Sequence, residues 1–240
     1  MLRLELTLPT AEENLALDEA LLDQAEAAGG AAEVLRLWEP AAPMVVVGRS
    51  SRVAAEVHET ACQQLGIPVL RRASGGAAIV TGPGSLMYAV VLSLQSRPAL
   101  RSIEAAHAYV LGRLADCLGP LVPGVRRQGT SDLALADSRK FSGNSLRVKR
   151  DHLLYHGTLL YDFRCELIER CLAMPPRQPG YRAGRSHREF VANLPLGRGA
   201  LSRAVIGGWC AEGVLIDWPE ERTRRLAAEK YSRSDWNYRH

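Results

Sequence analysis

Apolar positions recur at helical spacing from the first residues onward. Thr10 and Glu13 have the spacing of a capping box that starts a helix. One face of this helix is then marked by Leu17, Leu21, Ala25 and Ala28, and the Gly29–Gly30 pair ends it. Similar periodicity predicts helices at about 53–65, 103–118 and 166–172. Two more are expected towards the C-terminus, the second starting near Pro219.

Between these helices, short apolar or alternating runs predict strands. They are Met44–Val47, Ile67–Leu70, Ala77–Val80, Leu86–Leu94, Leu133–Ala136, Lys140–Phe141, Leu146–Arg150 and His152–Phe163. The turn Thr81–Gly84 joins two of them, and residues 175–199 read as a long loop. Many short strands with turn-length connectors predict an α+β fold with a mixed, largely antiparallel sheet flanked by helices. Residues 1–240 are expected to form one catalytic domain.

Composition and charge favour a soluble enzyme. Hydrophobic residues make up 47% and charged residues 23% of the 240 positions, as in ordinary globular proteins. The net charge of +4 suits an acidic partner or an anionic substrate but is too small for a nucleic-acid-binding footprint.

The same sequence shows no membrane-spanning run and no signal peptide, because Glu5 interrupts the short N-terminal apolar stretch. Five scattered cysteines without a C-x-x-C pair favour reduced thiols. We therefore expect a cytoplasmic protein that binds neither membrane nor nucleic acid.

A glycine-rich segment near the middle of the N-terminal half is the first candidate site. Arg71 and Arg72 precede Ser74, Gly75 and Gly76. Backbone rich in glycine approaches a ligand closely and leaves successive N–H groups facing one concavity. Together with the arginine charges, this segment predicts a nucleotide or acyl-phosphate site. Taken alone, a glycine pair is equally typical of a tight bend.

Three further polar residues follow at intervals. Lys140, just before Ser142-Gly143-Asn144, could neutralise charge on a phosphoryl or carbonyl oxygen, although most lysines are simply solvated. His156, before Gly157 and Thr158, could position a substrate or exchange a proton, or pack with its ring satisfied by backbone. Asp132 could serve a metal-bound phosphate or a ribose, or be a turn carboxylate.

In this order, the segments resemble the lipoate–protein ligase A and octanoyltransferase family, whose catalytic domain is similar to class II biotin ligases. The segments that carry the resemblance are Asn14–Leu21, Val45–Arg49, RRASGG, Ser131–Ser145, His156–Asp162, Tyr181–Arg188, Lys230–Tyr231 and Trp236–Asn237. They cover nearly the whole chain. The pair RR-x-SGG and K-x-SGN is specific.

The resemblance implies activation of lipoate by ATP to lipoyl-adenylate, followed by transfer to a lysine of a lipoyl carrier domain or a glycine-cleavage H-like protein. It places Lys140 at the carboxyl–phosphate junction, and Asp132 near the phosphates and Mg²⁺. The implied substrate and adenylate set also contains Arg71, Arg72, Ser74, Gly75, Gly76, Ala77, Ser142, Gly143, Asn144, His156, Gly157 and Thr158. An apolar slot for the lipoyl tail is expected from Ile79, Val80 and Met87.

This chain departs from the family pattern in three places. Ala77 stands where the family usually has a third glycine, and Thr81-Gly82 stands where it usually has His-Asp. The turn that follows, up to Gly84, resembles the octanoyltransferase branch. Because the chain stops soon after Trp236-Asn237, we expect no C-terminal accessory domain, its role being either dispensable or supplied by a separate subunit.

Two other functions remain open at this stage. One is octanoyl transfer from an acyl carrier protein through a cysteine thioester, for which Cys171 has about the right position. Its flanking residues, Arg170 and Leu172, differ from the Pro-Cys-Gly context of such transferases and favour a buried helical thiol. The other is a non-catalytic lipoate binder, against which the retained Arg71 and Lys140 weigh.

Overall fold

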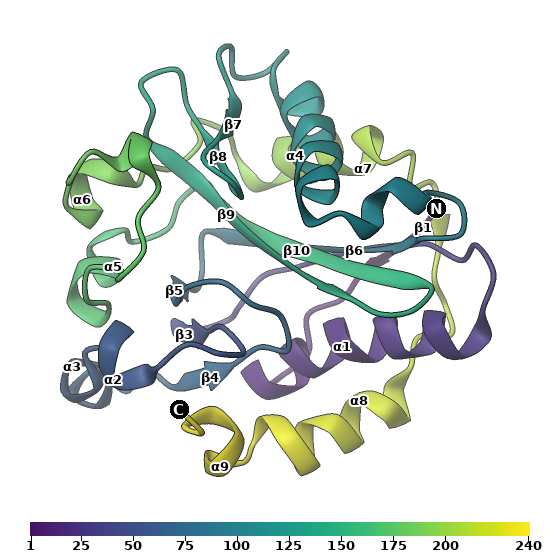
Figure 1. Ribbon diagram of the computed structural model, residues 1–240, viewed down its shortest axis with the longest axis horizontal. Coiled ribbons are helices and arrows are strands. Elements are labelled where there is room, and N and C mark those ends of the chain that lie inside the picture. Colours follow the sequence, from purple (N-terminus) through teal and green to yellow (C-terminus); the bar gives the residue numbers. More distant parts are fainter.

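Two β-sheets form the framework of the molecule (Figure 1). A computed structural model describes residues 1–240. The larger sheet has eight strands in the order β11-β1-β2-β6-β10-β9-β8-β7, and the smaller has three in the order β4-β3-β5. The strands are β1 (Leu2–Glu5), β2 (Val34–Trp38), β3 (Met44–Val47), β4 (Val69–Arg71), β5 (Ile79–Thr81), β6 (Ser85–Ser93), β7 (Arg126–Gln128), β8 (Asp132–Ala134), β9 (Lys140–Val148), β10 (His152–Leu160) and β11 (Gly213–Val214).

Helices cover both faces of the larger sheet. In Figure 1, α1 lies below its long central strands, whereas α4 and α7 lie above them. The α-helices are α1 (Ala11–Ala28), α2 (Val53–Glu56), α3 (Glu59–Gln64), α4 (Ile103–Leu118), α5 (Glu166–Cys171), α6 (His187–Phe190), α7 (Arg198–Gly208), α8 (Glu220–Leu226) and α9 (Ser234–Asn237). Short 3-10 turns occur at Pro98–Arg101 and Gly180–Arg182, and a π-helical turn at Ala227–Tyr231. None of the helices is long and apolar enough to cross a lipid bilayer.

The first helix begins and ends as its sequence predicts. Thr10 Oγ1 accepts a hydrogen bond from Glu13 N, and the Glu13 carboxylate accepts one from Thr10 N, which completes the capping box. Gly29 follows the last turn with φ 67°, a conformation that glycine adopts without strain. Leu17 and Leu21 pack beneath the sheet, so the apolar stripe has its expected role.

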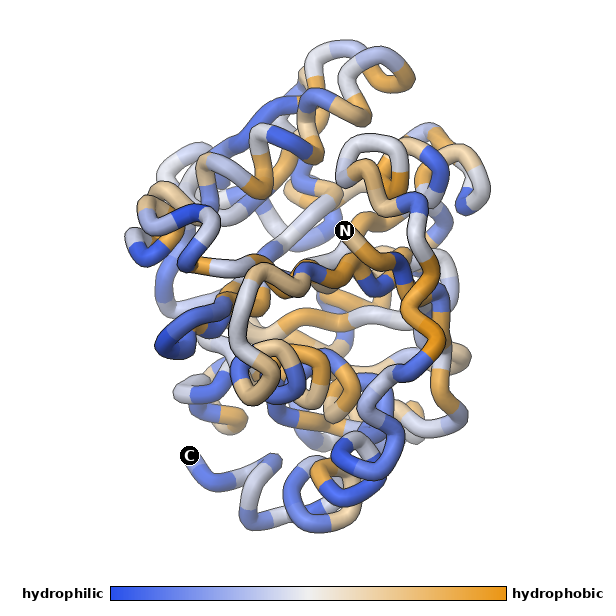
Figure 2. Tube along the Cα trace, turned by 90° about the vertical axis from the view of Figure 1, so that its right-hand side faces the viewer, coloured by the Kyte–Doolittle hydropathy of each residue, from blue (hydrophilic) through white to orange (hydrophobic).

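The central strand β6 is buried on both faces. Tyr88, Val90 and Leu92 belong to the core cluster beneath α4, while Ala89 and Val91 face the cluster that includes α1. Successive side chains of a strand point to opposite faces, so both layers of helices draw on the same strand. Figure 2 accordingly shows hydrophobic residues gathered in the central strands, whereas the terminal segment that ends at the C-terminus is mostly hydrophilic.

The mixed, mainly antiparallel α+β architecture is confirmed, but two local expectations were wrong. The helix expected over 53–65 is two short helices, because Val57 pairs with Leu172 and interrupts it. The Thr81–Gly84 turn joins two strands as predicted, and it leads from β5 in the small sheet to β6 in the large one. The short strands expected at 140–141 and 146–150 are one continuous strand, β9, paired along β10.

The C-terminal segment is fastened to the small sheet by Arg71. Its guanidinium is fully buried and donates to Gly48 O at 2.7 Å, Ser51 O at 2.8 Å and Asn237 O at 2.9 Å. Asn237 Oδ1 in turn accepts from Arg71 N at 2.9 Å, and Trp236 Nε1 donates to Arg71 O at 2.9 Å. Residues more than 160 positions apart in the sequence are thereby joined.

Replacing Arg71 should loosen this junction. We expect Arg71→Ala to lower the free energy of unfolding by about 2–4 kcal/mol, because several buried carbonyls lose a charged donor. Urea unfolding measures the difference. Arg224→Ala is the control, since Arg224 is exposed and pairs only with Glu220 one helical turn away, a contact worth about 0.3–0.5 kcal/mol. Equal stability of the two variants would contradict the role of Arg71.

Candidate functional site

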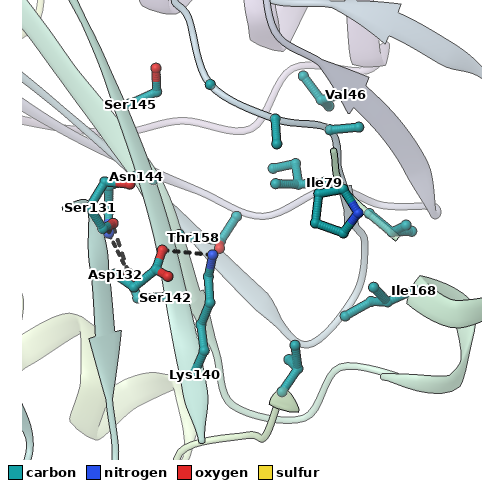
Figure 3. Close-up of a pocket in the computed structure, with 18 of the residues that line it drawn as sticks. Val46, Ile79, Ser131, Asp132, Lys140, Ser142, Asn144, Ser145, Thr158 and Ile168 are labelled. Carbon is teal, nitrogen blue, oxygen red and sulfur yellow. Dashed lines mark hydrogen bonds and ion pairs between the residues drawn. The ribbon is translucent and has the colours of Figure 1, made fainter. Parts of the chain in front are cut away.

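A cavity of about 410 Å³ is lined by residues of both sheets. Figure 3 shows polar side chains of β8 and β9 on one side and the apolar side chains Val46, Ile79 and Ile168 on the other. A cavity of this size and lining suits a small ligand with an apolar tail and a charged head. The expected slot residues Ile79, Val80 and Met87 all line it.

Lys140 and Asp132 form an ion pair at the polar wall. Lys140 Nζ lies 2.7 Å from Asp132 Oδ1, and the side chain of Lys140 is about one-quarter exposed (27%) (Figure 3). The ammonium is therefore partly open to the cavity and can approach an anionic ligand. Tyr181 OH donates to Asp132 Oδ2 at 2.8 Å, so both carboxylate oxygens are engaged.

The K-x-SGN segment brings three polar residues to one face of β9. Lys140, Ser142 and Asn144 alternate along the strand and line the cavity. Asn144 is held by Tyr88 OH, 2.5 Å from Oδ1, and by its own donation to Ser131 O at 2.8 Å. A Cβ on Gly157 of the neighbouring strand would lie 1.9 Å from Asn144 Oδ1, so this position requires glycine.

The turn Ser74–Ala77 has all four of its carbonyl groups bound by the protein. Ser74 O accepts from Arg49 N, and Gly75 O accepts from Arg72 and from Ser145 Oγ. Gly76 O accepts from Ser51 Oγ, and Ala77 O from Arg72 Nη2. The orientation of each peptide plane in the turn is thereby fixed.

The amide groups of the same turn remain free. Gly75 N, Gly76 N and Ala77 N donate to no other protein group, and Gly76 and Ala77 line the cavity. Successive free backbone amides form a concavity that binds anions. The free amides of Gly76 and Ala77 at the cavity therefore make this segment a candidate anion-binding turn.

Arg72 holds this turn from within. Its guanidinium donates to Val46 O, Gly75 O and Ala77 O, and it is buried. Burial lowers the pKa of Arg72 to about 10, although Glu56 opposes the shift. At neutral pH the side chain remains charged, but its donors are committed to the protein.

His156 is bound at both ring nitrogens. Nε2 lies 2.6 Å from Ser74 Oγ, and Nδ1 lies 3.0 Å from Asp18 Oδ2. Burial raises the pKa of Asp18, but Arg36 and His156 outweigh it and hold that pKa below its usual value. Asp18 is therefore ionised and His156 has no free ring nitrogen to exchange a proton with a ligand.

Most of the residues expected at a site do meet at this cavity. Those that line it are Arg72, Gly76, Ala77, Ile79, Asp132, Lys140, Ser142, Gly143, Asn144, His156, Gly157 and Thr158. Arg71, Ser74 and Gly75 do not line it. For Arg71 the reason is geometric, because neighbouring residues of a strand point to opposite sides and Arg71 faces the C-terminal segment.

Sequence reasoning missed several polar residues that the structure brings to the cavity, among them Asp18, Arg177 and Arg182. Asp18 lies within the Asn14–Leu21 segment but was not distinguished from the rest of the helix. Arg182 and Arg177 come from the segment expected to be a loop. Arg182 is buried and stacks on Phe190 at 4.8 Å. An acidic residue within an otherwise apolar helical face was the one available signal for Asp18.

The metal expected at Asp132 finds no preformed set of ligands. The two Asp132 oxygens are taken by Lys140 and Tyr181, and no group of three His, Cys, Asp or Glu residues is placed to hold an ion. Mg²⁺ prefers octahedral oxygen coordination. The protein alone therefore offers no preformed cage for magnesium. Because Mg²⁺ is commonly held by one or two carboxylates together with substrate phosphates, the role of Asp132 towards it stays a prediction.

None of the five cysteines lines the cavity. Cys171, at the end of α5, is fully buried, as expected from its sequence context. Burial raises the pKa of the Cys171 thiol, while its hydrogen bond with Cys62 opposes the shift. The pKa of Cys62 is raised to about 12, chiefly by burial. At neutral pH both are thiols rather than nucleophilic thiolates.

Free amides in a fixed turn, an accessible lysine–aspartate pair and an apolar pocket together form a site that suits a ligand with an aliphatic chain and an anionic head. The sequence profile described as "Lipoyl protein ligase A/B catalytic domain" matches residues 10–199, and the chain belongs to this family. It is thus an enzyme of the lipoate ligase and octanoyltransferase family.

Similar proteins come from both branches of that family. "Octanoyltransferase LipM" of Carboxydothermus hydrogenoformans is 27% identical over 95% of this chain and 94% of that protein. "Probable lipoate-protein ligase A" of Mycoplasma pneumoniae is 30% identical over 62% of this chain, and the match spans 42% of that protein, less than half its length.

A solved structure shares the fold. The bi-partite lipoate protein ligase of Thermoplasma acidophilum, studied with its E2 lipoyl domain, superimposes with a TM-score of 0.84. The likeness covers 99% of this chain and 95% of that one, at 23% identity.

The backbone of Gly48 lies close to Gly76, and substitution of Gly48 therefore tests whether the protein's stability depends on this close approach to the Ser74–Ala77 turn. A Cβ there would lie 1.9 Å from Gly76 O, whereas a Cβ on Gly75 would meet nothing within 4 Å. We expect Gly48→Ala to lower the free energy of unfolding by about 1–3 kcal/mol, and the matched Gly75→Ala to leave it nearly unchanged. Urea denaturation compares the two, and similar values would show that the turn does not depend on this approach.

Thiol reactivity tests the cysteine environments. We expect iodoacetamide at pH 8 to modify exposed Cys210 in the native protein, and Cys62 and Cys171 only after unfolding in urea. Burial and raised pKa both leave the latter two without accessible thiolate. Peptide mass spectrometry follows each site. If Cys171 in the native protein were labelled as fast as Cys210, Cys171 would again be a candidate nucleophile.

Proposed function

We propose that this chain is a lipoate–protein ligase that activates lipoate with ATP and transfers the lipoyl group to a lysine of a lipoyl carrier domain. The observation that carries the proposal is the meeting of Lys140 and the free amides of Gly76 and Ala77 at one cavity with an apolar wall. Such a site can bind an acyl chain and two anionic groups at once.

The chemistry consists of two substitutions. A carboxylate oxygen of lipoate attacks the α-phosphorus of ATP, and pyrophosphate leaves with the electron pair of the broken bond. The uncharged amine of the carrier lysine then attacks the acyl carbon, AMP leaves, and the amine loses a proton to solvent. In the first step negative charge lies on the α-phosphate oxygens and the departing pyrophosphate. In the second step it develops on the acyl oxygen and on the bridging oxygen that leaves with AMP. An ammonium at the carboxyl–phosphate junction stabilises the charge in both steps.

The residues have separate roles in this proposal. Lys140 stabilises that charge, and Asp132 holds its ammonium in place with Tyr181 behind it. The amides of the Ser74–Ala77 turn bind phosphate oxygens. Ile79, Val80 and Met87 contact the aliphatic tail and exclude water from the reacting groups.

The alternative is octanoyl transfer without ATP, and the similarity to the octanoyltransferase of Carboxydothermus hydrogenoformans supports considering it. A cysteine thioester needs a thiolate at the acyl group. Here the cavity is lined by no cysteine, and Cys171 is buried outside it. These observations favour the ligase. A non-catalytic binder is disfavoured because Lys140 is available where a reacting carboxyl would lie.

The deciding experiment follows the intact mass of an apo lipoyl domain in two reactions. One contains lipoate, ATP and magnesium, and the other octanoyl carrier protein without ATP. We expect a lipoyl mass shift in the first reaction alone. An octanoyl shift in the second alone would replace the ligase with the transferase. Silence in both, with lipoate binding seen by calorimetry, would identify a binder.

Lys140→Ala should reduce lipoyl transfer by about 10²–10³-fold, the usual loss when one charge-stabilising group is removed. Lys149→Ala is a matched control, because Lys149 also pairs with an aspartate, Asp23, and its side chain is equally exposed at 27%. We expect the control to retain nearly full activity. Near-normal turnover by Lys140→Ala would refute the assigned role.

A further inference from the structure

A continuous chain of polar contacts runs from Arg36 of β2 through α1 and β10 to the Ser74–Ala77 turn. Arg36 Nη1 donates to Asp18 Oδ1 at 2.6 Å, and Asp18 Oδ2 lies 3.0 Å from His156 Nδ1. His156 Nε2 then lies 2.6 Å from Ser74 Oγ. Three sequence-distant elements and the turn thus share one network, and all four of its side chains are at most 11% exposed.

The charges in this network determine the direction of each hydrogen bond. Asp18 is ionised and can only accept, so His156 Nδ1 must carry the ring proton. In the neutral imidazole with this tautomer, Nε2 is an acceptor, and Ser74 donates its hydroxyl proton to it. The lone pairs of Ser74 Oγ remain for a donor, and Arg72 Nε fills this place at 3.1 Å.

The last contact connects the network to the turn itself. Arg72 Nη2 donates to Gly75 O at 2.5 Å and to Ala77 O at 3.0 Å. These two carbonyls must face Arg72 for the amides of the turn to face away from it. If the ring proton of His156 were on Nε2 instead of Nδ1, Ser74 Oγ would face two donors, Nε2–H and Arg72 Nε–H. The Ser74 hydroxyl proton would then have no acceptor.

We propose that Asp18 and His156 are positioning residues that fix one histidine tautomer, orient Ser74 and Arg72, and so preorganise the turn that binds the anionic group of the substrate. The identification of this group as a phosphate of ATP rests on the proposed function. The histidine tautomer and the orientation of Ser74 and Arg72 do not depend on that function. Groups held before binding need no further ordering when the ligand arrives, which lowers the cost of binding.

The arrangement has the connectivity of a Ser-His-Asp triad, but the geometry assigns it a different role. A nucleophilic serine must reach the acyl group, whereas Ser74 is 1% exposed and does not line the cavity. Its oxygen is also engaged by Arg72. The network of Asp18, His156 and Ser74 therefore orders the turn, and Ser74 does not attack the substrate.

The tautomer can be measured without any assay of activity. Long-range ¹H–¹⁵N spectra of the whole protein distinguish protonated from unprotonated ring nitrogens, and the loss of one signal set in His156→Gln assigns them. At neutral pH we expect Nδ1–H and unprotonated Nε2. Ser74→Ala should keep this tautomer, because Asp18 determines it. An Nε2–H tautomer in the wild-type protein would overturn the proposal.

Kinetics of lipoate-dependent ATP–pyrophosphate exchange test the consequence. Ser74→Ala breaks the link between His156 and Arg72, and we expect the KM for ATP to rise about tenfold, the equivalent of roughly one hydrogen bond. Lipoate binding, measured by calorimetry, should change less than about twofold, because Ser74 does not line the cavity. Ser96→Ala, at an exposed turn, is the serine control and should match the wild type.

The conservative variant separates positioning from mere packing. His156→Gln retains an acceptor for Ser74 and a donor for Asp18, and should keep the KM for ATP nearer the wild-type value than His156→Leu does. Equal effects of glutamine and leucine, or a normal KM in Ser74→Ala, would overturn the proposal. Labelling of Ser74 by a fluorophosphonate would also overturn it, since it would show an activated nucleophile.

These outcomes are distinct from failure of the ligase assignment. If the wild-type protein shows no ATP–pyrophosphate exchange, the proposed function is wrong. The histidine tautomer still tests whether Asp18 and His156 position Ser74 and Arg72. If both the wild type and the Ser74→Ala variant exchange normally, the positioning role of Asp18 and His156 is wrong, and the proposed ligase function is unaffected.

Discussion

The site depends on how the carbonyl groups of one short turn are bound. Although Gly75, Gly76 and Ala77 are exposed, all four carbonyls of Ser74–Ala77 find donors within the protein. With every carbonyl turned towards the protein, the amides of the turn are left unpaired at the cavity. An anion site thus results from satisfying the opposite ends of the same peptide groups.

The adjacent residues Arg71 and Arg72 stabilise different segments around the turn. Arg72 faces the turn and binds its carbonyls, whereas Arg71 faces the other side of the strand and binds the C-terminal segment. Both guanidiniums are planar groups with several donors, which suits them to bridging backbone carbonyls. The two adjacent arginines therefore have different structural roles, and most donors of each guanidinium are bound by protein carbonyls.

Lys140 can meet the ligand because its own partner leaves it partly exposed. Asp132 is held by Tyr181 from the segment between α5 and α6, so the polar wall is assembled from β8, β9 and that segment together. The apolar wall comes from the small sheet and α5. The opposition of the two walls matches a substrate that is charged at one end and aliphatic at the other.

The sequence by itself determined the capped first helix and the mixed sheet, because these depend on local spacing. That the glycine turn and Lys140 lie at one site was implied by the resemblance to a known family and not by spacing. The sequence could not determine the continuity of β9, where pairing with β10 outweighs the weak strand propensity of Gly143 and Asn144. Nor could it assign Arg71 to the C-terminal segment or Asp18 to His156. Those contacts join residues 138 and 166 positions apart, and only the packing of whole elements decides which side chains meet.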